Sequence, residues 1–71
     1  MMKKISVSLS GHQTSISLER EFFDALQKIA TTENRPVAAI ISEIDASRDA
    51  DCNLSSAVRV WILRRVMRRN D

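Results

Sequence analysis

Residues 14–44 have the sequence TSISLEREFFDALQKIATTENRPVAAIISEI, in which the spacing of the apolar residues changes along the chain. Up to Leu18, apolar and polar residues alternate, which is typical of a strand with one buried face. From Glu19 onward the apolar residues follow the spacing of an amphipathic helix. Pro36 interrupts this pattern, because it disfavours helical geometry in the preceding residue and suits the first position of a new helix. The stretch therefore predicts a strand, a helix, a short turn and a second helix.

The alternation extends toward the N-terminus, where apolar residues from Ile5 to Leu9 are separated by serines. Gly11 is the only glycine of the chain and predicts a bend, bulge or break. On the other side, Asn53 or Ser55 can cap a third helix after a polar, aperiodic segment. The expected elements are a ribbon over about 4–18, helices over about 19–33 and 36–47, a loop over 48–53 and a helix over about 54–69.

With 71 residues, the chain is long enough for one domain, which we expect to span residues 1–71. A chain this short buries only about 60% of its unfolded surface, so a monomer is marginally stable. Cys52 and His12 are the single cysteine and histidine, which argues against a disulfide and against a metal site. Oligomerisation is then the favoured source of additional core.

No apolar run approaches the roughly 18 residues of a membrane-spanning helix, and the start of the chain does not have the pattern of a signal peptide. We therefore expect a cytoplasmic protein with no membrane partner.

Charge is distributed unevenly along the chain. Residues 55–71 contain five arginines and one acidic residue, whereas residues 1–54 contain more acidic than basic residues. This asymmetry indicates an anionic partner for the last helix, either DNA phosphates or an acidic protein, although a solvated face would have the same composition. The residues expected in such contacts are Arg64, Arg65, Arg68 and Arg69.

The pattern resembles the ribbon-helix-helix family, which includes the Arc and methionine repressors and reads DNA with a β-ribbon. The segments that carry the resemblance are Gly11-His12, Thr14–Glu19, Phe22-Phe23, Glu43–Asp45 and Asn53–Val60. They are similar to a bacterial branch described as ribbon-helix-helix domain-containing proteins, and together they cover most of the chain.

This resemblance implies a mainly α fold with a short β-ribbon, assembled as an intertwined homodimer with an additional C-terminal helix. Each chain would contribute one strand to the ribbon, and the helices of both chains would share one core. The residues expected in that dimer core are Ile16, Leu18, Phe22, Leu26, Ile29, Val37, Ile40, Ile41, Ile44 and Trp61.

If Ile16 and Leu18 face the core, then Gln13, Ser15 and Ser17 face outward. The resemblance implies that these outward residues contact base edges in the major groove, where Gln pairs with adenine and Ser with several bases. An ordinary solvated strand face is the alternative. The residues expected to contact phosphates are Lys3, Lys4, His12, Arg35 and Val37, the last two at the start of the second helix.

The sequence contains no phosphate-binding glycine loop and no nucleophile or metal-ligand motif. We therefore expect a protein that is not an enzyme and needs no cofactor. The function that the resemblance implies is sequence-selective binding of double-stranded DNA by a homodimer, as a transcriptional regulator. The alternative is a protein-interaction module, such as an antitoxin whose basic C-terminal helix binds a partner protein.

Overall fold

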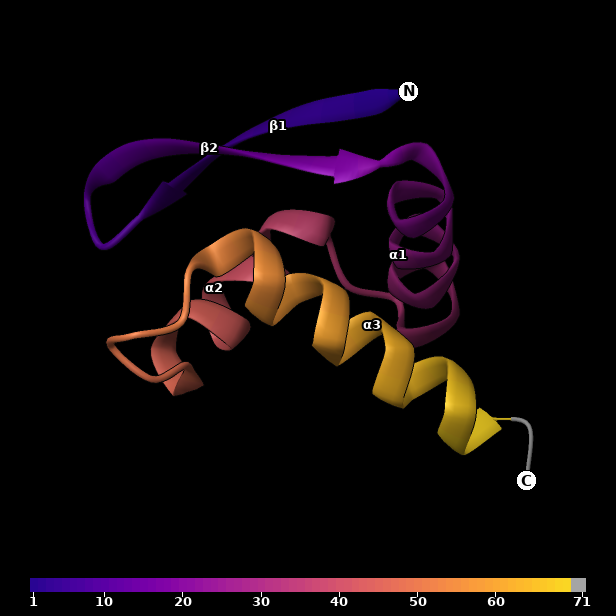
Figure 1. Ribbon diagram of the computed structural model, residues 1–71. Helices are drawn as coiled ribbons and strands as arrows, with labels where there is room; N and C mark the ends of the chain where they lie inside the picture. The colour runs from indigo at the N-terminus through magenta and orange to yellow at the C-terminus, as the bar shows by residue number, and fades with distance from the viewer. Residues whose placement is uncertain (70–71) are drawn as a thin grey trace.

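The computed structural model describes residues 1–69, apart from the side chain of Arg69, and arranges them as a β-hairpin above helices (Figure 1). The elements are β1 (Met2–Leu9), β2 (His12–Glu19), α1 (Arg20–Glu33), α2 (Val37–Ser47) and α3 (Leu54–Arg69). This order confirms the expected ribbon-helix-helix fold with an additional C-terminal helix. No helix in the described range is both long and apolar enough to cross a membrane.

Both strands of the ribbon belong to the same chain, whereas the resemblance implied one strand from each of two chains. The strands pair antiparallel, with Leu9 opposite His12 next to the turn. The turn residues Ser10 and Gly11 have φ values of 51° and 81°, as in the type I′ turns whose twist matches that of the flanking strands. The bend expected at Gly11 is thus a tight hairpin turn, which places a second strand beside β2 without a partner chain.

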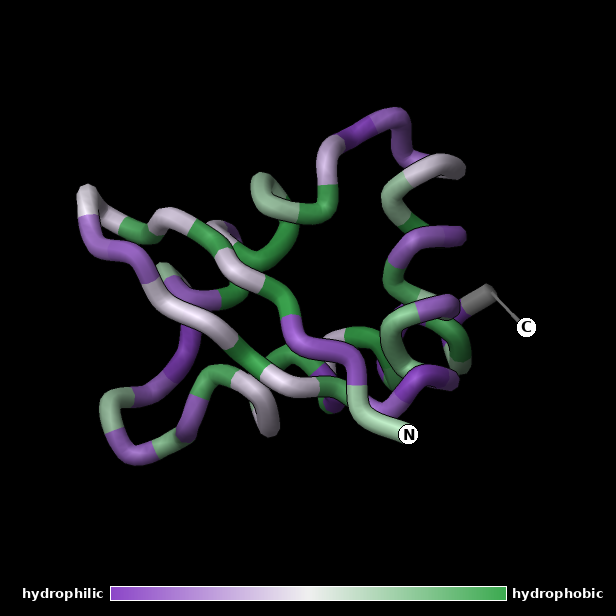
Figure 2. Tube along the Cα trace, turned by 90° about the horizontal axis from the view of Figure 1, so that it is seen from above, coloured by the Kyte–Doolittle hydropathy of each residue, from purple (hydrophilic) through white to green (hydrophobic). Residues whose placement is uncertain are grey.

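One face of the hairpin is apolar and packs on the helices. Val7 and Leu9 of β1 and Ile16 and Leu18 of β2 are buried, whereas the residues between them are mostly exposed. Figure 2 shows this alternation of hydrophobic and hydrophilic residues along the strands. Because an isolated two-stranded hairpin is marginally stable in water, its burial on the helices is what stabilises it.

The short turn between α1 and α2 depends on Asn34 and Pro36. Asn34 has the left-handed conformation (φ 57°), and its N–H donates to the carbonyl oxygens of Ala30 and Thr31, which satisfies acceptors at the end of α1. Pro36 is extended (φ −69°, ψ 148°) directly before α2, where its missing N–H removes no helical hydrogen bond.

All five elements contribute to one hydrophobic core. Its buried members are Val7, Leu9, Ile16, Leu18, Leu26, Ile29, Ala30, Ile40, Ile41, Ile44, Val58 and Ile62. Of the residues expected in a core shared by two chains, Phe22, Val37 and Trp61 are only partly buried and pack at its edge. Because Val58 and Ile62 are 0% and 1% exposed, α3 closes the core of the single chain.

Candidate nucleic-acid interface

The exposed face of the hairpin is formed by two rows of polar side chains. Gln13, Ser15 and Ser17 of β2 are exposed, as expected from the alternation. Directly opposite them on β1 lie Ser8, Ser6 and Lys4, in that order. Opposite residues of an antiparallel pair project from the same face. We call these six residues (Lys4, Ser6, Ser8, Gln13, Ser15, Ser17) the outer hairpin face.

Sequence reasoning missed Ser6 and Ser8 as site residues. The alternation from Ile5 to Ser10 already indicated that they lie on one face, but their place beside Ser15 and Gln13 depends on the pairing within the chain. The signal that could have predicted it is a single glycine between two alternating segments, which is typical of a hairpin turn.

The outer hairpin face is polar but carries little charge. Its serines and glutamine supply hydrogen-bond donors and acceptors, and Lys4 supplies its positive charge. Two strands about 4.8 Å apart form a ribbon that the major groove of DNA, about 12 Å wide, can admit. The arrangement is therefore suited to contacts with base edges rather than to strong attraction of phosphates.

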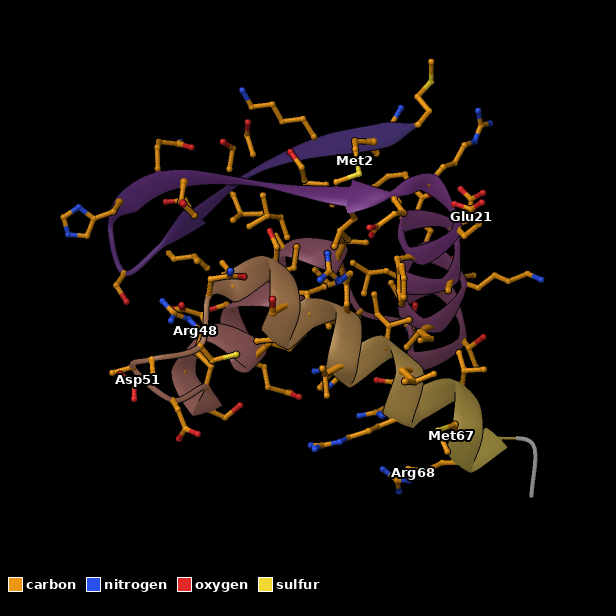
Figure 3. All side chains as sticks on the ribbon, viewed as in Figure 1. Met2, Glu21, Arg48, Asp51, Met67 and Arg68 are labelled. Carbon is orange, nitrogen blue, oxygen red and sulfur yellow. The ribbon has the colours of Figure 1, made fainter. Side chains whose placement is uncertain are left out.

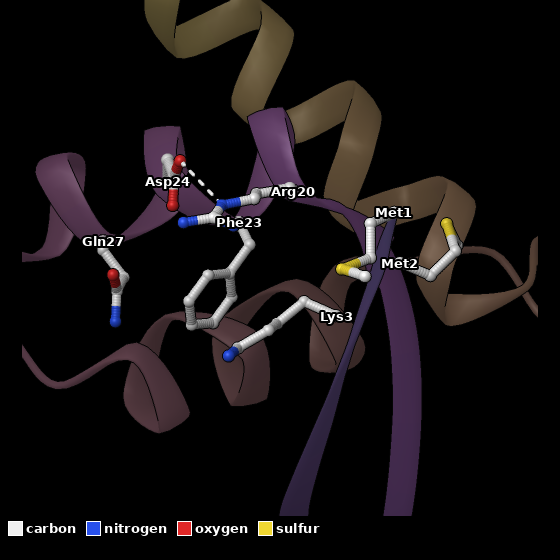
Figure 4. Close-up of a pocket in the computed structure, with 7 residues that line it drawn as sticks. All are labelled: Met1, Met2, Lys3, Arg20, Phe23, Asp24 and Gln27. Atoms are coloured by element: carbon white, nitrogen blue, oxygen red, sulfur yellow. Dashed lines mark ion pairs between the residues drawn. The ribbon is translucent and has the colours of Figure 1, made fainter.

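Lys3 and Lys4 lie on opposite faces of the hairpin. Lys3 is opposite Leu18, on the side of the helices, and its Nζ lies 5.6 Å from the centre of the Phe23 ring, in range for a cation–π contact. Figure 4 shows this contact at a hollow of about 420 Å³, beside an ion pair between Arg20 and Asp24. Of the two lysines, only Lys4 shares a face with the expected base-contacting residues.

His12 lies at the other end of the hairpin. It is exposed, pairs with Leu9 and directly follows the turn. Its position at the tip places it close in sequence to Gln13 but away from the start of β1, where Lys3 and Lys4 are. Of the residues expected to contact phosphates, Lys3 and Lys4 therefore lie at the open end of the hairpin and His12 lies at its turn.

Arg35 is held by two carboxylates of the same chain. Its Nη1 donates to Glu43 at 2.7 Å and its Nη2 to Glu33 at 2.8 Å. The guanidinium therefore links the end of α1 to α2. Val37, the first residue of α2, is half-buried, and its neighbour Pro36 has no N–H to donate. Of the residues expected as a phosphate anchor here, Arg35 already has carboxylate partners.

The structure separates the arginines of α3 into two groups. Arg65 forms an ion pair with Glu33 and stacks on Trp61, with its Cζ 4.5 Å from the ring centre. Arg59 lies 3.6 Å from Glu19. Arg64 and Arg68 are exposed and form no ion pair within the part of the chain that the structure describes. The expected contact through the Arg69 side chain lies outside the described residues.

The exposed side of α3 and the outer hairpin face lie on opposite sides of the molecule. The buried stripe of α3, with Val58 and Ile62, packs against the same core as the inner face of the hairpin. Figure 1 shows α3 below the hairpin, and Figure 3 shows Arg68 and Met67 at the end of α3 far from β1 and β2. A DNA duplex lying along the hairpin would not reach this side. Among the described residues, no group of acidic, histidine or cysteine side chains has the arrangement of a metal site.

A two-stranded polar ribbon supported by two helices and a short turn defines a class of small DNA-binding domain. The chain matches the family model of the ribbon-helix-helix domain over residues 2–66, and it belongs to this family. Members of the family generally bind DNA and regulate transcription, typically as homodimers, and the fold is not an enzymatic one. No curated protein and no solved structure matches the chain significantly.

Proposed function

We propose that the protein binds double-stranded DNA selectively by placing the outer hairpin face in the major groove, as a homodimer that regulates transcription. The observation that carries this proposal is the pairing of Ser8, Ser6 and Lys4 with Gln13, Ser15 and Ser17 on one exposed face. This face has the width and the hydrogen-bonding groups that base readout requires, and the family to which the chain belongs binds DNA.

The chemistry of the face favours some bases over others. Gln13 can donate to and accept from adenine through its amide, and the serines can serve several bases. The commonest specific contact to guanine comes from arginine or lysine, and Lys4 is the only cation of this face. We therefore expect an A·T pair at the position contacted by Gln13, near the turn of the hairpin.

Phosphate contacts would come from the surroundings of the face. We assign this role to Lys4 on the face, to His12, which is exposed beside the turn and pairs with Leu9, and to the amide of Val37 at the start of α2. Each neutralised phosphate makes the slope of log K against log salt steeper by about 0.9. Because each protomer offers few cations, we expect its DNA affinity to depend only weakly on salt.

The width of the hairpin limits how two copies of the protein would bind DNA together. A second copy that added its β2 to the free edge of β2 would form a four-stranded sheet, about 14 Å between its outer strands. This is wider than the major groove, about 12 Å. We therefore assign one hairpin to one groove, so that a dimer contacts two half-sites.

Fluorescence anisotropy of labelled genomic fragments, titrated at low and moderate salt, tests the proposal. Ser15→Glu and Ser17→Glu each place a carboxylate in the groove, and we expect at least about a tenfold loss of affinity for the preferred fragment. Ser42→Glu is the matched control, because Ser42 is exposed on α2. Unaltered affinity in both hairpin variants, with circular dichroism showing the same fold, would contradict the proposed mechanism.

A further inference from the structure

The exposed side of α3 carries apolar residues that the core does not use. Val60, Leu63, Val66 and Met67 are 45%, 52%, 38% and 60% exposed. Three of them, Val60, Leu63 and Met67, follow the i, i+3, i+7 spacing that places side chains in one stripe along a helix. These three lie opposite the stripe of Val58 and Ile62 that enters the core, whereas Val66, four residues after Ile62, lies beside that stripe. We call Val60, Leu63 and Met67 the outer α3 face.

Among the residues that the structure describes, none forms an ion pair with the positive charges beside this face. Arg64 and Arg68 are exposed and four residues apart, and no carboxylate of the described residues pairs with either. Within Leu54–Arg69 there is no aspartate or glutamate. Like charges at this spacing destabilise an isolated helix, so carboxylates from outside the chain would relieve a repulsion and also gain two ion pairs.

A hollow extends the outer α3 face toward α2. It has a volume of about 270 Å³ and is lined on one side by Ile44, Val60, Trp61 and Arg64 and on the other by residues of the loop, among them Arg48 and Asp49. Figure 1 shows the loop between α2 and α3 at this end of the molecule. A concave site beside an apolar stripe suits an anchoring side chain of a protein segment, whereas a flat bilayer surface could not fill it.

Charge and position exclude two other occupants. A second copy that packed its own α3 here would bring arginines but no carboxylate, because α3 contains none. A DNA duplex on the outer hairpin face would lie on the opposite side of the molecule (Figure 3). DNA phosphates would also leave Val60, Leu63 and Met67 exposed.

We propose that the outer α3 face docks an amphipathic helical segment of another protein, with apolar residues along one side and carboxylates four residues apart beside them. The apolar residues cover Leu63 and Met67, and the carboxylates pair with Arg64 and Arg68. This docking is independent of the DNA-binding function proposed above and leaves the hairpin free.

A pair of designed peptides tests the proposal. Each is a labelled helical peptide of about 15 residues with leucines at i, i+3 and i+7, flanked in one by glutamates and in the other by lysines at the same positions. In anisotropy titrations we expect the glutamate peptide to bind at least about tenfold more tightly than the lysine peptide. Equal binding of the two peptides, or no saturable binding of the glutamate peptide, would overturn it.

Variants of the protein locate the contact. Arg64→Glu combined with Arg68→Glu should invert the preference between the two peptides, and Leu63→Gln should weaken the glutamate peptide about tenfold. Ala38→Gln, at an exposed position of α2, is the matched control and should change nothing. Because these side chains are exposed, the fold should persist, as circular dichroism would verify. If the arginine and leucine variants bind like the parent, the docking surface lies elsewhere and the proposal is wrong.

Competition experiments distinguish docking of a protein from binding of an anionic surface, and two variants distinguish this proposal from the DNA-binding proposal. Displacement of the glutamate peptide by phosphatidylglycerol vesicles or by a duplex without a preferred site would assign the face to an anionic surface and overturn docking of a protein. The Ser15→Glu variant should still bind the peptide, and Leu63→Gln should still bind the preferred DNA fragment. Failure of one proposal is thereby distinguishable from failure of the other.

Discussion

At the scale of single residues, the hairpin depends on two positions with positive φ. Ser10 and Gly11 have φ values of 51° and 81°, and a type I′ turn requires this conformation at both central positions. Gly11 adopts it without steric cost, whereas Ser10 does not. Space is not the constraint at Gly11, because a Cβ built there meets nothing within 4 Å.

Substitutions in the turn should therefore change stability through backbone conformation alone. We expect Gly11→Ala to lower the free energy of unfolding by about 1 kcal/mol and Gly11→Asn by less, because Asn tolerates the left-handed region. Ser10→Asn should raise it by a few tenths of a kcal/mol, since Asn-Gly is the favoured pair in this turn. Urea denaturation followed by circular dichroism measures all three. A Gly11→Ala variant as stable as the parent would argue against this turn.

At the scale of the elements, the start of α3 shows how one side chain sets where a helix begins. The sequence left Asn53 and Ser55 as alternative caps. The structure selects Asn53, whose Oδ1 accepts a hydrogen bond from the N–H of Ser56 at 2.8 Å. This bond satisfies one of the first amides of the helix, which have no partner within it.

Removal of this cap should destabilise the domain, because α3 closes the core. We expect Asn53→Ala to cost about 1 kcal/mol, Asn53→Asp to retain most of the stability, and Ser55→Ala to have little effect. Thermal and urea denaturation of the three variants provide the comparison. If Ser55→Ala were the more harmful change, the cap would be assigned to the wrong residue.

At the scale of the whole molecule, one carboxylate ties three helices together. Glu33 at the end of α1 pairs with Arg35, which also reaches Glu43 of α2, and with Arg65 of α3. The side chains of Glu33, Arg35 and Arg65 are 25–31% exposed, so solvent screens them less than a surface pair. These contacts hold Arg65 against α1, whereas Arg64 and Arg68 stay exposed.

Glu33→Gln should leave Arg35 and Arg65 close together without a charge between them, and we expect a loss of about 1–2 kcal/mol in the free energy of unfolding. Asp24→Asn is the control, because its pair with Arg20 is 63–71% exposed at 3.9 Å and should contribute less than about 0.5 kcal/mol. Guanidinium chloride would mask the charges, so urea is the denaturant to use. Equal effects of the two substitutions would show that the network does not stabilise the fold.

Much of the fold was predictable because it rests on short-range rules. The period of two before Leu18, the helical period after Glu19 and the break at Pro36 arise from local geometry, and each can be seen in the sequence alone. For the same reason the outward position of Gln13, Ser15 and Ser17 follows from the burial of Ile16 and Leu18 between them.

Only the tertiary structure decided which segments meet, because pairing depends on contacts between residues far apart in the chain. Sequence patterns could not show that β1 pairs with β2 of the same chain, which completes the outer hairpin face with Lys4, Ser6 and Ser8. Nor could they show that Arg65 forms an ion pair with Glu33 whereas Arg64 and Arg68 stay exposed. The alternation of side chains is a property of one strand, but a charge is neutralised or left free only by what packs beside it.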